Sequence, residues 1–353
     1  MRRPAARAIV AAFAGLSVLL TACGQTAGSP QGGADDGIVD VVASTSVYGD
    51  IVSTIGGDKV RVNSIITRTS QDPHSYEATT QDKLAVSKAE LVVENGGGYD
   101  DFIHKLADDT GLDHSNVLNA VELSGLVPEE SETGASHDAD GHGHDHAGFN
   151  EHVWYSLPAM ARLADAVAAK LGELDPSSAE TFRSNAGALK DSLGALESEL
   201  AAVRASAGQG AAAVTEPVPM YLLEAAGLEN KTPAEYMSAI ESGADVPPAA
   251  LKTAVDLVGS GGVKLLAYNL QTEGPQTLAL KDAALAAEVP VLDFSETLPD
   301  GKDYLQWMTD NVDGIVRTLS CARSGHQPGC KYKCGPNGWP GPGRAGPKII
   351  GTA

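Results

Sequence analysis

The segment DPSSAETFRSNAGALKDSLGALESELAAVRA, residues 175–205, determines how the rest of the chain is organised. Its apolar residues recur at spacings of three and four, so they share one face of a helix. They are Phe182, Ala186, Leu189, Leu193, Leu196, Leu200 and Val203. Asp175 followed by Pro176 is typical of a helix start, with Asp175 as the N-cap. A helix over residues 177–205 would be about 44 Å long and could join two lobes as a stiff strut. A helical hairpin inside one domain is the alternative.

Strand-like and helix-like segments alternate on both sides of this helix. Before it, the pattern predicts strands at 39–43, 60–66 and 91–94, helices at 48–55 and 79–89, and an amphipathic segment at 158–171. After it, the pattern predicts strands at 211–215, 264–269 and 289–294 and a helix at 276–287. This alternation predicts an α/β fold with mostly parallel sheets covered by helices. The predicted boundaries are a first lobe at 38–174, a connecting helix at 175–206 and a second lobe at 207–320.

Four metal-ligating side chains follow predicted strands or loops, two from each half of the chain. They are His74, His152, Glu216 and Glu296. Because ligands of open α/β sheets bind beyond the carboxyl ends of the strands, these residues predict a site in the cleft between the halves. Two neutral imidazoles and two carboxylates would also neutralise a divalent cation. Each residue alone would more simply be a cap or a loop residue, so the prediction rests on the set.

A second group of imidazoles lies in the segment 136–149, which has no apolar periodicity and is expected to be a flexible loop. It contains His137, His142, His144 and His146. Imidazole is a common ligand of zinc, so the loop is expected to capture metal as an auxiliary to the main site. A solvated low-complexity insert is the alternative interpretation.

Two motifs carry a family resemblance. The segment SQDPHSYE at 70–77 and the segment NEHVW at 150–154, which follows the His-rich loop, resemble the zinc/manganese solute-binding lipoproteins of metal ABC transporters. The resemblance covers residues 39–319. It implies two α/β lobes joined by one long rigid helix, with a metal ion bound in the interlobe cleft and delivered to a membrane permease.

The resemblance also implies a ligand set. The family's first two histidine ligands match His74 and His152, and its third ligand, His or Glu, matches Glu216. Its fourth, usually Asp, matches Glu296 by position, but Asp293 lies three residues earlier and is an alternative. Metal binding to deprotonated ligands predicts an affinity that falls as the pH drops through the histidine pKa, about 6.5 when unperturbed.

The first residues have the features of an export signal. Arg2, Arg3 and Arg7 precede an apolar run at 8–20 that is too short to span a bilayer, which predicts a signal peptide at 1–22. The sequence LTAC at 20–23 resembles a lipobox, which implies cleavage before Cys23 and its lipidation; an ordinary signal peptide with a chance Cys is the alternative. Residues 23–37 are expected to form a flexible tether. The protein is therefore expected on the outer face of the bacterial cytoplasmic membrane.

The last residues, 321–353, differ in composition from the rest. They contain five basic and no acidic residues, with 13 Gly and Pro, and are expected to be a disordered tail outside the family pattern. A small zinc site of Cys321, His326, Cys330 and Cys334 is the alternative, although this spacing matches no common zinc motif. Between the two ends, residues 23–320 hold 17 Lys and Arg against 46 Asp and Glu, a net charge of −29 compared with −21 for the whole chain. Such acidity argues against a nucleic-acid partner and suits a cation ligand.

The two metals of the resembling family are favoured by different features. The paired carboxylates are similar to those of manganese carriers, whereas the loop of four imidazoles suits Zn²⁺ much better than Mn²⁺. We therefore predict a monomeric carrier, not an enzyme, that takes Zn²⁺ (alternatively Mn²⁺) as its transported ligand. A surface adhesin and a zinc hydrolase are competing interpretations. The hydrolase is disfavoured because four protein ligands would close the zinc site and no His-Glu-x-x-His or Gly-x-Ser-x-Gly motif is present.

Overall fold

The computed structural model of the protein describes residues 37–71, 73–127 and 149–323, without the side chains of 321–323. The predicted signal peptide, most of the tether, the imidazoles of the His-rich loop and nearly all of the predicted tail lie outside the described residues. In the described part of the chain, no helix has the length and apolar character needed to cross a bilayer.

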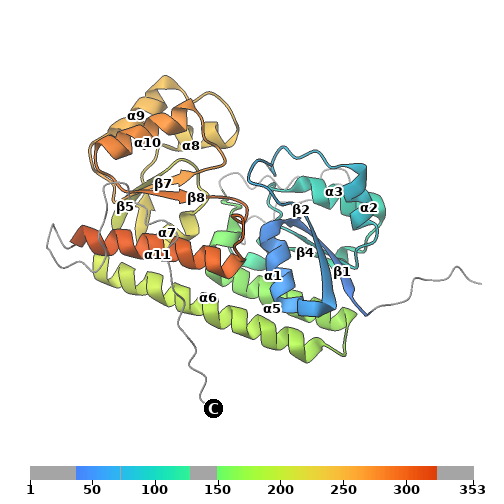
Figure 1. The fold of residues 1–353 in the computed structure, drawn as a ribbon. Helices are drawn as coiled ribbons and strands as arrows, with labels where there is room; N and C mark the ends of the chain where they lie inside the picture. The colour runs from blue at the N-terminus through green and yellow to red at the C-terminus, as the bar shows by residue number, and fades with distance from the viewer. Residues whose placement is uncertain (1–36, 72, 128–148, 324–353) are drawn as a thin grey trace, which may run out of the picture. The chain divides into compact units, whose positions relative to one another are not determined.

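The first lobe contains a parallel sheet of four strands in the order β2-β1-β3-β4 (Figure 1). The strands are β1 (Val39–Thr45), β2 (Val60–Ile66), β3 (Leu91–Glu94) and β4 (Val117–Asn119). The helices are α1 (Ser46–Gly56), α2 (Thr80–Val86), α3 (Asp101–Thr110) and α4 (Ala120–Ser124), with 3-10 turns η1 (Gly57–Lys59) and η2 (His114–Asn116). The register sets Val41 opposite both Val62 and Leu91.

The central strands β1 and β3 of this sheet are buried on both faces, which explains why they are apolar in sequence. Val41 and Ala43 of β1 point into a core shared with α1, whereas Val42 points to the other face, into a core with Phe102 and Ile103 of α3. The alternation follows from the two-residue period of a strand. The sheet therefore lies between two helical layers, as the alternating pattern predicted.

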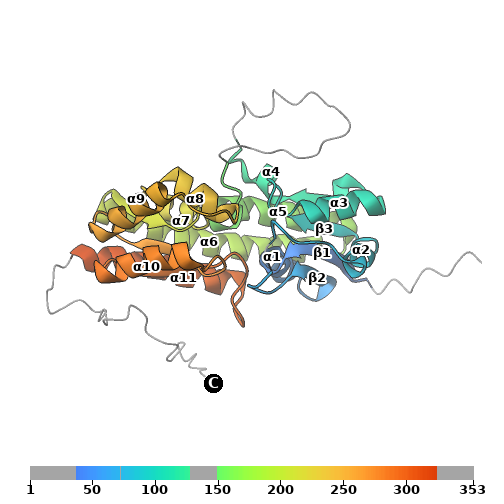
Figure 2. The same ribbon diagram turned by 90° about the horizontal axis from the view of Figure 1, so that it is seen from above.

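The second lobe repeats the same topology. Its parallel sheet has the order β6-β5-β7-β8. The strands are β5 (Gly210–Val214), β6 (Leu228–Asn230), β7 (Leu266–Asn269) and β8 (Val291–Phe294), and the helices are α7 (Met220–Ala225), α8 (Ala234–Glu241), α9 (Pro248–Gly259) and α10 (Pro275–Ala286). Figure 1 shows α8, α9 and α10 gathered beside β7 and β8, and Figure 2 shows α2 and α3 beside the first sheet.

The connecting helix is α6 (Ala179–Ala207), whose buried residues are the seven members of the predicted apolar stripe. It pairs with the preceding α5 (Leu157–Leu174), so the alternative of a helical hairpin is partly right. However, α6 also packs against α1 of the first lobe and α7 of the second, so it joins the two lobes. The final helix, α11 (Tyr304–Arg323), packs along α6 and contacts both α1 and β8.

The predicted start of the connecting helix is wrong by two residues. Asp175 does not cap α6: its carboxylate accepts from the backbone N–H of Ser177 at 3.0 Å and from the Ser177 hydroxyl at 2.7 Å. In this local Asx turn the Asp175 carboxylate bonds to Ser177, which precedes the helix, instead of to the first backbone N–H groups of α6. The helix begins after Ser178, whose backbone carbonyl accepts from the N–H of Phe182 at 3.1 Å.

Candidate metal site

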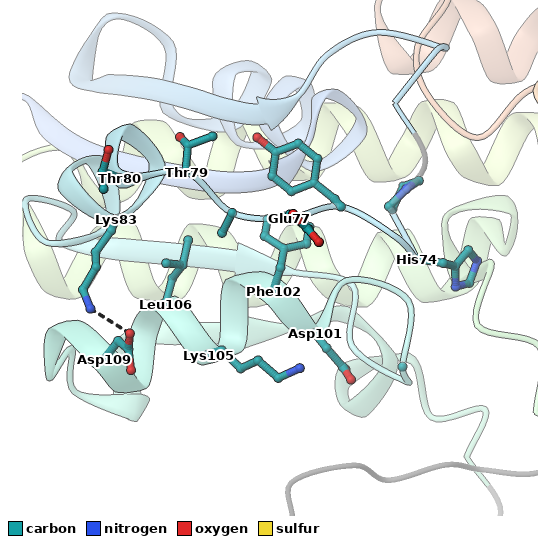
Figure 3. A pocket seen from close by; sticks show the side chains of 14 residues that line it. His74, Glu77, Thr79, Thr80, Lys83, Asp101, Phe102, Lys105, Leu106 and Asp109 are labelled. Atoms are coloured by element: carbon teal, nitrogen blue, oxygen red, sulfur yellow. Dashed lines mark hydrogen bonds and ion pairs between the residues drawn. The ribbon is translucent and has the colours of Figure 1, made fainter.

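His74 lies in the loop between β2 and α2. Its ring packs edge-to-face against Tyr99, with the ring centroids 4.9 Å apart and the planes at 82°. The His74 side chain remains 32% exposed, so an ion from solvent can reach it. A shallow cavity of about 550 Å³ runs from His74 between α2 and α3, as Figure 3 shows. Farther along this cavity the Nζ of Lys83 pairs with the Oδ2 of Asp109 at 2.7 Å, so the charge of that carboxylate is already compensated.

His152 is buried at the start of the 3-10 turn η4 (Val153–Tyr155), with 2% of the residue exposed. Its Nδ1 lies 2.7 Å from the Oδ1 of Asn150. Because a carbonyl oxygen only accepts, this contact places the ring proton on Nδ1 and leaves Nε2 as the ligand nitrogen. Asn150 is held in turn, because its Nδ2 donates to the carbonyl of Pro217 at 3.0 Å.

The His152 imidazole is neutral over the whole physiological range, because its pKa is far below that range. Burial, with a smaller effect from nearby His74, lowers the pKa of His152 to about 3. Neutral imidazole is the form that binds a metal ion. The pKa of His152 therefore lies well below the unperturbed value of about 6.5, because desolvation disfavours the charged ring.

Glu151 completes a group that the sequence analysis missed. His74, Glu151 and His152 each offer one ligand atom, and these three atoms lie within 4.8 Å of one another. We call these residues the first-lobe donor set. The Glu151 Oε1 is 3.8 Å from the His74 Nε2. Burial raises the pKa of Glu151 to about 7, and the carboxylates of Glu241 and Glu216 add to the shift. In the sequence, Glu151 directly precedes the predicted ligand His152, and this adjacency could have identified it as a residue of the site.

Glu216 and Glu296 follow β5 and β8, and their residues are only 5% and 6% exposed. We call them the second-lobe carboxylate pair. One amide joins them: the Nδ2 of Asn269 donates to the Oε2 of Glu216 at 2.5 Å and to the Oε1 of Glu296 at 2.8 Å. The Thr272 hydroxyl also donates to Glu216. The backbone N–H of Asn269 donates to the Thr215 hydroxyl at 2.8 Å, which fixes the position of the amide.

Tyr99 links the two groups across the lobes. Its hydroxyl donates to the Oε2 of Glu296 at 3.1 Å, while its ring packs against His74 and lies 5.9 Å from the ring of His152. The structure thus brings the two predicted histidines together, and separately the two predicted glutamates, on either side of one tyrosine. Among the described residues, the four predicted ligands do not form a single group with all ligand atoms within 4.8 Å.

Asp293, the alternative fourth ligand, has a different environment. It lies within β8, its side chain is 39% exposed, and its Oδ1 is 3.6 Å from the Nζ of Lys281. Glu296, three residues later, has turned inward, because the Gln271 Oε1 accepts from its backbone N–H at 2.7 Å. Only Glu296 of these two acids shares Asn269 with Glu216.

Two parallel-sheet lobes joined by a long helix, with the imidazoles of His74 and His152 on one side and two buried carboxylates on the other, define a two-lobed solute-binding protein. The chain belongs to the ZnuA family, described as zinc-uptake complex component A, periplasmic, whose family model matches residues 41–318. This confirms the resemblance seen in the motifs. The family is made up of solute-binding proteins rather than enzymes, in agreement with the prediction that the chain is not an enzyme.

Individual relatives are identical to this chain at a little over a quarter of the aligned residues. The metal ABC transporter substrate-binding lipoprotein ScbA of Streptococcus cristatus is 29% identical over 185 residues, covering 50% of this chain and 53% of ScbA. The manganese-binding lipoprotein MntA of Bacillus subtilis is 28% identical over 183 residues, with the same coverage of 50% and 53%. The chain therefore spans about half the length of these curated relatives.

A solved structure matches over most of the fold. The solute-binding protein FpvC from Pseudomonas aeruginosa, in complex with Mn²⁺, superposes with a TM-score of 0.64 and 23% identity, covering 81% of this chain and 99% of FpvC. This confirms the predicted architecture of two parallel-sheet lobes with the long helix α6 between them.

Proposed function

We propose that this protein captures a divalent transition metal ion outside the cytoplasm and delivers it to the permease of an ABC transporter, with Zn²⁺ as the favoured ion. The family is described as a periplasmic zinc-uptake component, and relatives are named as substrate-binding lipoproteins of metal ABC transporters. The observation that carries the proposal is the meeting of two imidazoles and two buried carboxylates around Tyr99.

The carboxylate pair supports a cation rather than any other ligand. Glu216 and Glu296 are both almost fully buried and share the amide of Asn269, and the hydroxyls of Thr272 and Tyr99 also donate to them. These donors are neutral, so two ionised carboxylates held here would still repel each other. A divalent cation between this pair and the neutral His152 would compensate both charges without requiring a counterion in the protein. An anionic or apolar solute would find no such compensation.

The proposed ligands are His74 and His152 from the first lobe and Glu216 and Glu296 from the second. Glu296 is preferred to Asp293 because it shares Asn269 with Glu216, whereas Asp293 faces Lys281. Glu151 is added as a further carboxylate near the ion, since its Oε1 is 3.8 Å from the Nε2 of His74. A small closure of the lobes, with release of the Asn269 and Tyr99 contacts to the carboxylates, would bring the ligands onto the ion.

Zinc is favoured over manganese on chemical grounds. Imidazole suits Zn²⁺, and mixed nitrogen and oxygen sites generally bind Zn²⁺ more tightly than Mn²⁺. The four additional imidazoles of the His-rich loop act in the same direction. Manganese is the competing candidate because relatives such as MntA are named as manganese-binding and FpvC was solved with Mn²⁺.

Attachment to the membrane is proposed to occur through lipidated Cys23, with residues 23–37 as the tether. Relatives named as lipoproteins support this step. Cell fractionation of Cys23→Ala tests it: the variant should leave the membrane fraction, and complete retention there would contradict the anchor.

Calorimetric titration of the metal-stripped full chain with Zn²⁺ and with Mn²⁺ at pH 7 tests the metal site. We expect one tight Zn²⁺ site that His74→Ala with His152→Ala abolishes. The control Asp293→Asn should retain it, because Asp293 pairs with Lys281. Tight binding that survives in the first double variant would refute the proposed ligands, and Mn²⁺ binding without measurable Zn²⁺ binding would refute the choice of metal.

A further inference from the structure

A second group of metal-ligating side chains lies on the first lobe and shares no residue with the interlobe site. It consists of His104 and Asp108 on α3 and His114 on η2. One ligand atom from each of these three side chains lies within 4.8 Å of the other two. The Nε2 of His114 is 3.2 Å from the Oδ1 of Asp108, and the rings of His104 and His114 have centroids 5.7 Å apart.

The local sequence explains why these side chains converge. His104 and Asp108 are four residues apart on α3 and therefore lie on the same face of the helix. The helix ends at Gly111, whose left-handed backbone, with φ of 68°, reverses the chain. The carboxylate of Asp113 then accepts from the backbone N–H of Ser115 at 2.9 Å, which shapes the turn that returns His114 to the side of Asp108.

A buried carboxylate stands behind His104. Glu94, at the carboxyl end of β3, has a side chain only 3% exposed, and its Oε1 lies 3.2 Å from the Nδ1 of His104. The Nδ2 of Asn119 donates to the same oxygen at 2.9 Å. An outer carboxylate on the Nδ1 of a histidine fixes the ring and strengthens its other nitrogen as a ligand. Such a carboxylate is a frequent companion of histidine ligands in metal sites.

The electrostatic field at this place also favours a cation. The hydrogen bond to Glu94 raises the pKa of His104 to about 9 against the opposing effect of burial, and the charges of Asp108 and Asp101 contribute. Negative groups that stabilise a proton on His104 also stabilise a divalent ion beside it, although the ion must displace that proton.

We propose that His104, Asp108 and His114 form a second binding site for a divalent transition metal ion such as Zn²⁺, with Glu94 as the positioning residue for His104. Two imidazoles and one carboxylate are zinc ligands, and water completes the coordination. The His114 side chain is 64% exposed and that of Asp108 39%, so the ion exchanges directly with solvent. The site therefore fills after the interlobe site and releases its ion more readily.

The test is a Zn²⁺ titration of the full chain labelled with ¹³C in its nine histidine rings, followed by NMR. The single variants His104→Ala and His114→Ala assign the two signals. We expect these signals to move together, with one shared dissociation constant, after those of His74 and His152 have saturated. If neither signal moves at a Zn²⁺ concentration that fully shifts the histidines at 137–146, the proposal is wrong.

Variants separate this site from the interlobe site. In His114→Ala, whose ring is exposed and whose loss should leave the fold intact, the His104 signal should no longer respond to Zn²⁺. Glu94→Gln should weaken the shared dissociation constant by about 10–100-fold if Glu94 positions His104. In His74→Ala with His152→Ala, the responses of His104 and His114 should persist even if the interlobe proposal fails. Loss of their response there would show that this second site does not bind independently.

Discussion

The two lobes have the same strand order but different chemistry where they meet. The first lobe presents imidazoles packed among aromatic rings, with His152 in edge-to-face contact with Trp154 at 5.1 Å. The second lobe presents carboxylates, and these are held by an amide and a hydroxyl, from Asn269 and Thr272. A neutral imidazole can be buried against an aromatic wall, whereas a buried carboxylate needs N–H or O–H donors.

This difference shows how one topology can build two halves of a site. Glu216 and Glu296 directly follow the strands β5 and β8, whereas His74 and His152 lie in loops, so the two lobes offer their proposed ligands from different positions of the shared topology. Neither lobe alone supplies the proposed set of two nitrogen and two oxygen ligands. The contrast between the lobes can be tested by weakening each side in turn.

Removing the imidazole side should have the largest effect. His152→Ala deletes a preorganised Nε2 ligand and should reduce Zn²⁺ affinity by more than the about 10–100-fold typical of losing an outer-shell partner. Competition with a chelator of known affinity measures this change. If His152→Ala loses less Zn²⁺ affinity than Glu216→Gln does, the second lobe contributes more to binding than the first, contrary to this prediction.

Removing one charge from the carboxylate side should have the next largest effect. Glu216→Gln keeps the shape and one oxygen but removes a negative charge, so we expect Zn²⁺ affinity to fall by about tenfold or more. Asp293→Asn is the matched control, since Asp293 pairs with Lys281, and it should leave the affinity unchanged. A large loss in the control instead would identify Asp293 as the ligand.

The pH dependence should be governed by Glu151 rather than by His152. Burial raises the pKa of Glu151 to about 7, so below this pH the carboxyl is protonated and neutral and attracts the cation less. Zn²⁺ affinity should therefore fall as the pH drops through 7, whereas His152 remains neutral down to about pH 3. Zn²⁺ titrations between pH 6 and 8 should show that the affinity of Glu151→Gln depends less on pH than that of the unmodified protein. If the two dependences are equal, a group other than Glu151 takes up the proton that weakens Zn²⁺ binding.

The last effect concerns stability rather than affinity. Asn269→Ala leaves the second-lobe carboxylate pair without its shared donor, which should lower the free energy of unfolding of the metal-free protein by about 1–3 kcal/mol. Zn²⁺ should recover much of this loss, because the ion replaces the missing donor. Thermal unfolding with and without Zn²⁺ measures both values. Equal destabilisation in the two conditions would mean that the ion does not contact the pair.

Local patterns made much of the fold predictable. The seven apolar residues of the α6 stripe are all buried, and the strand at 60–66 matches β2, because period and β-branching are readable over a few residues. The helix α11 was not predicted. Its buried Trp307, Met308, Val312, Ile315 and Leu319 do recur at helical spacing, so the signal was present.

The site was only partly predictable, for a different reason. A glutamate after a predicted strand and a histidine in a motif after the His-rich loop can be identified locally, which is why Glu216 and His152 could be proposed. The roles of Tyr99 and Asn269 depend on contacts with residues 197 and 53 positions away, and such contacts exist only in the folded chain. Glu151 was missed because its proximity to His74 depends on how two loops pack together.

The packing of α6 into both lobes has a consequence for cooperativity. Val41 from the first sheet, Val214 from the second and Leu193 from α6 belong to one continuous hydrophobic core. Lobes that share a core are not expected to melt independently, so the metal-free protein should show one calorimetric transition in which the measured and van't Hoff enthalpies agree. An ion bound between the lobes would then raise the melting temperature of the entire body, including segments far from any ligand.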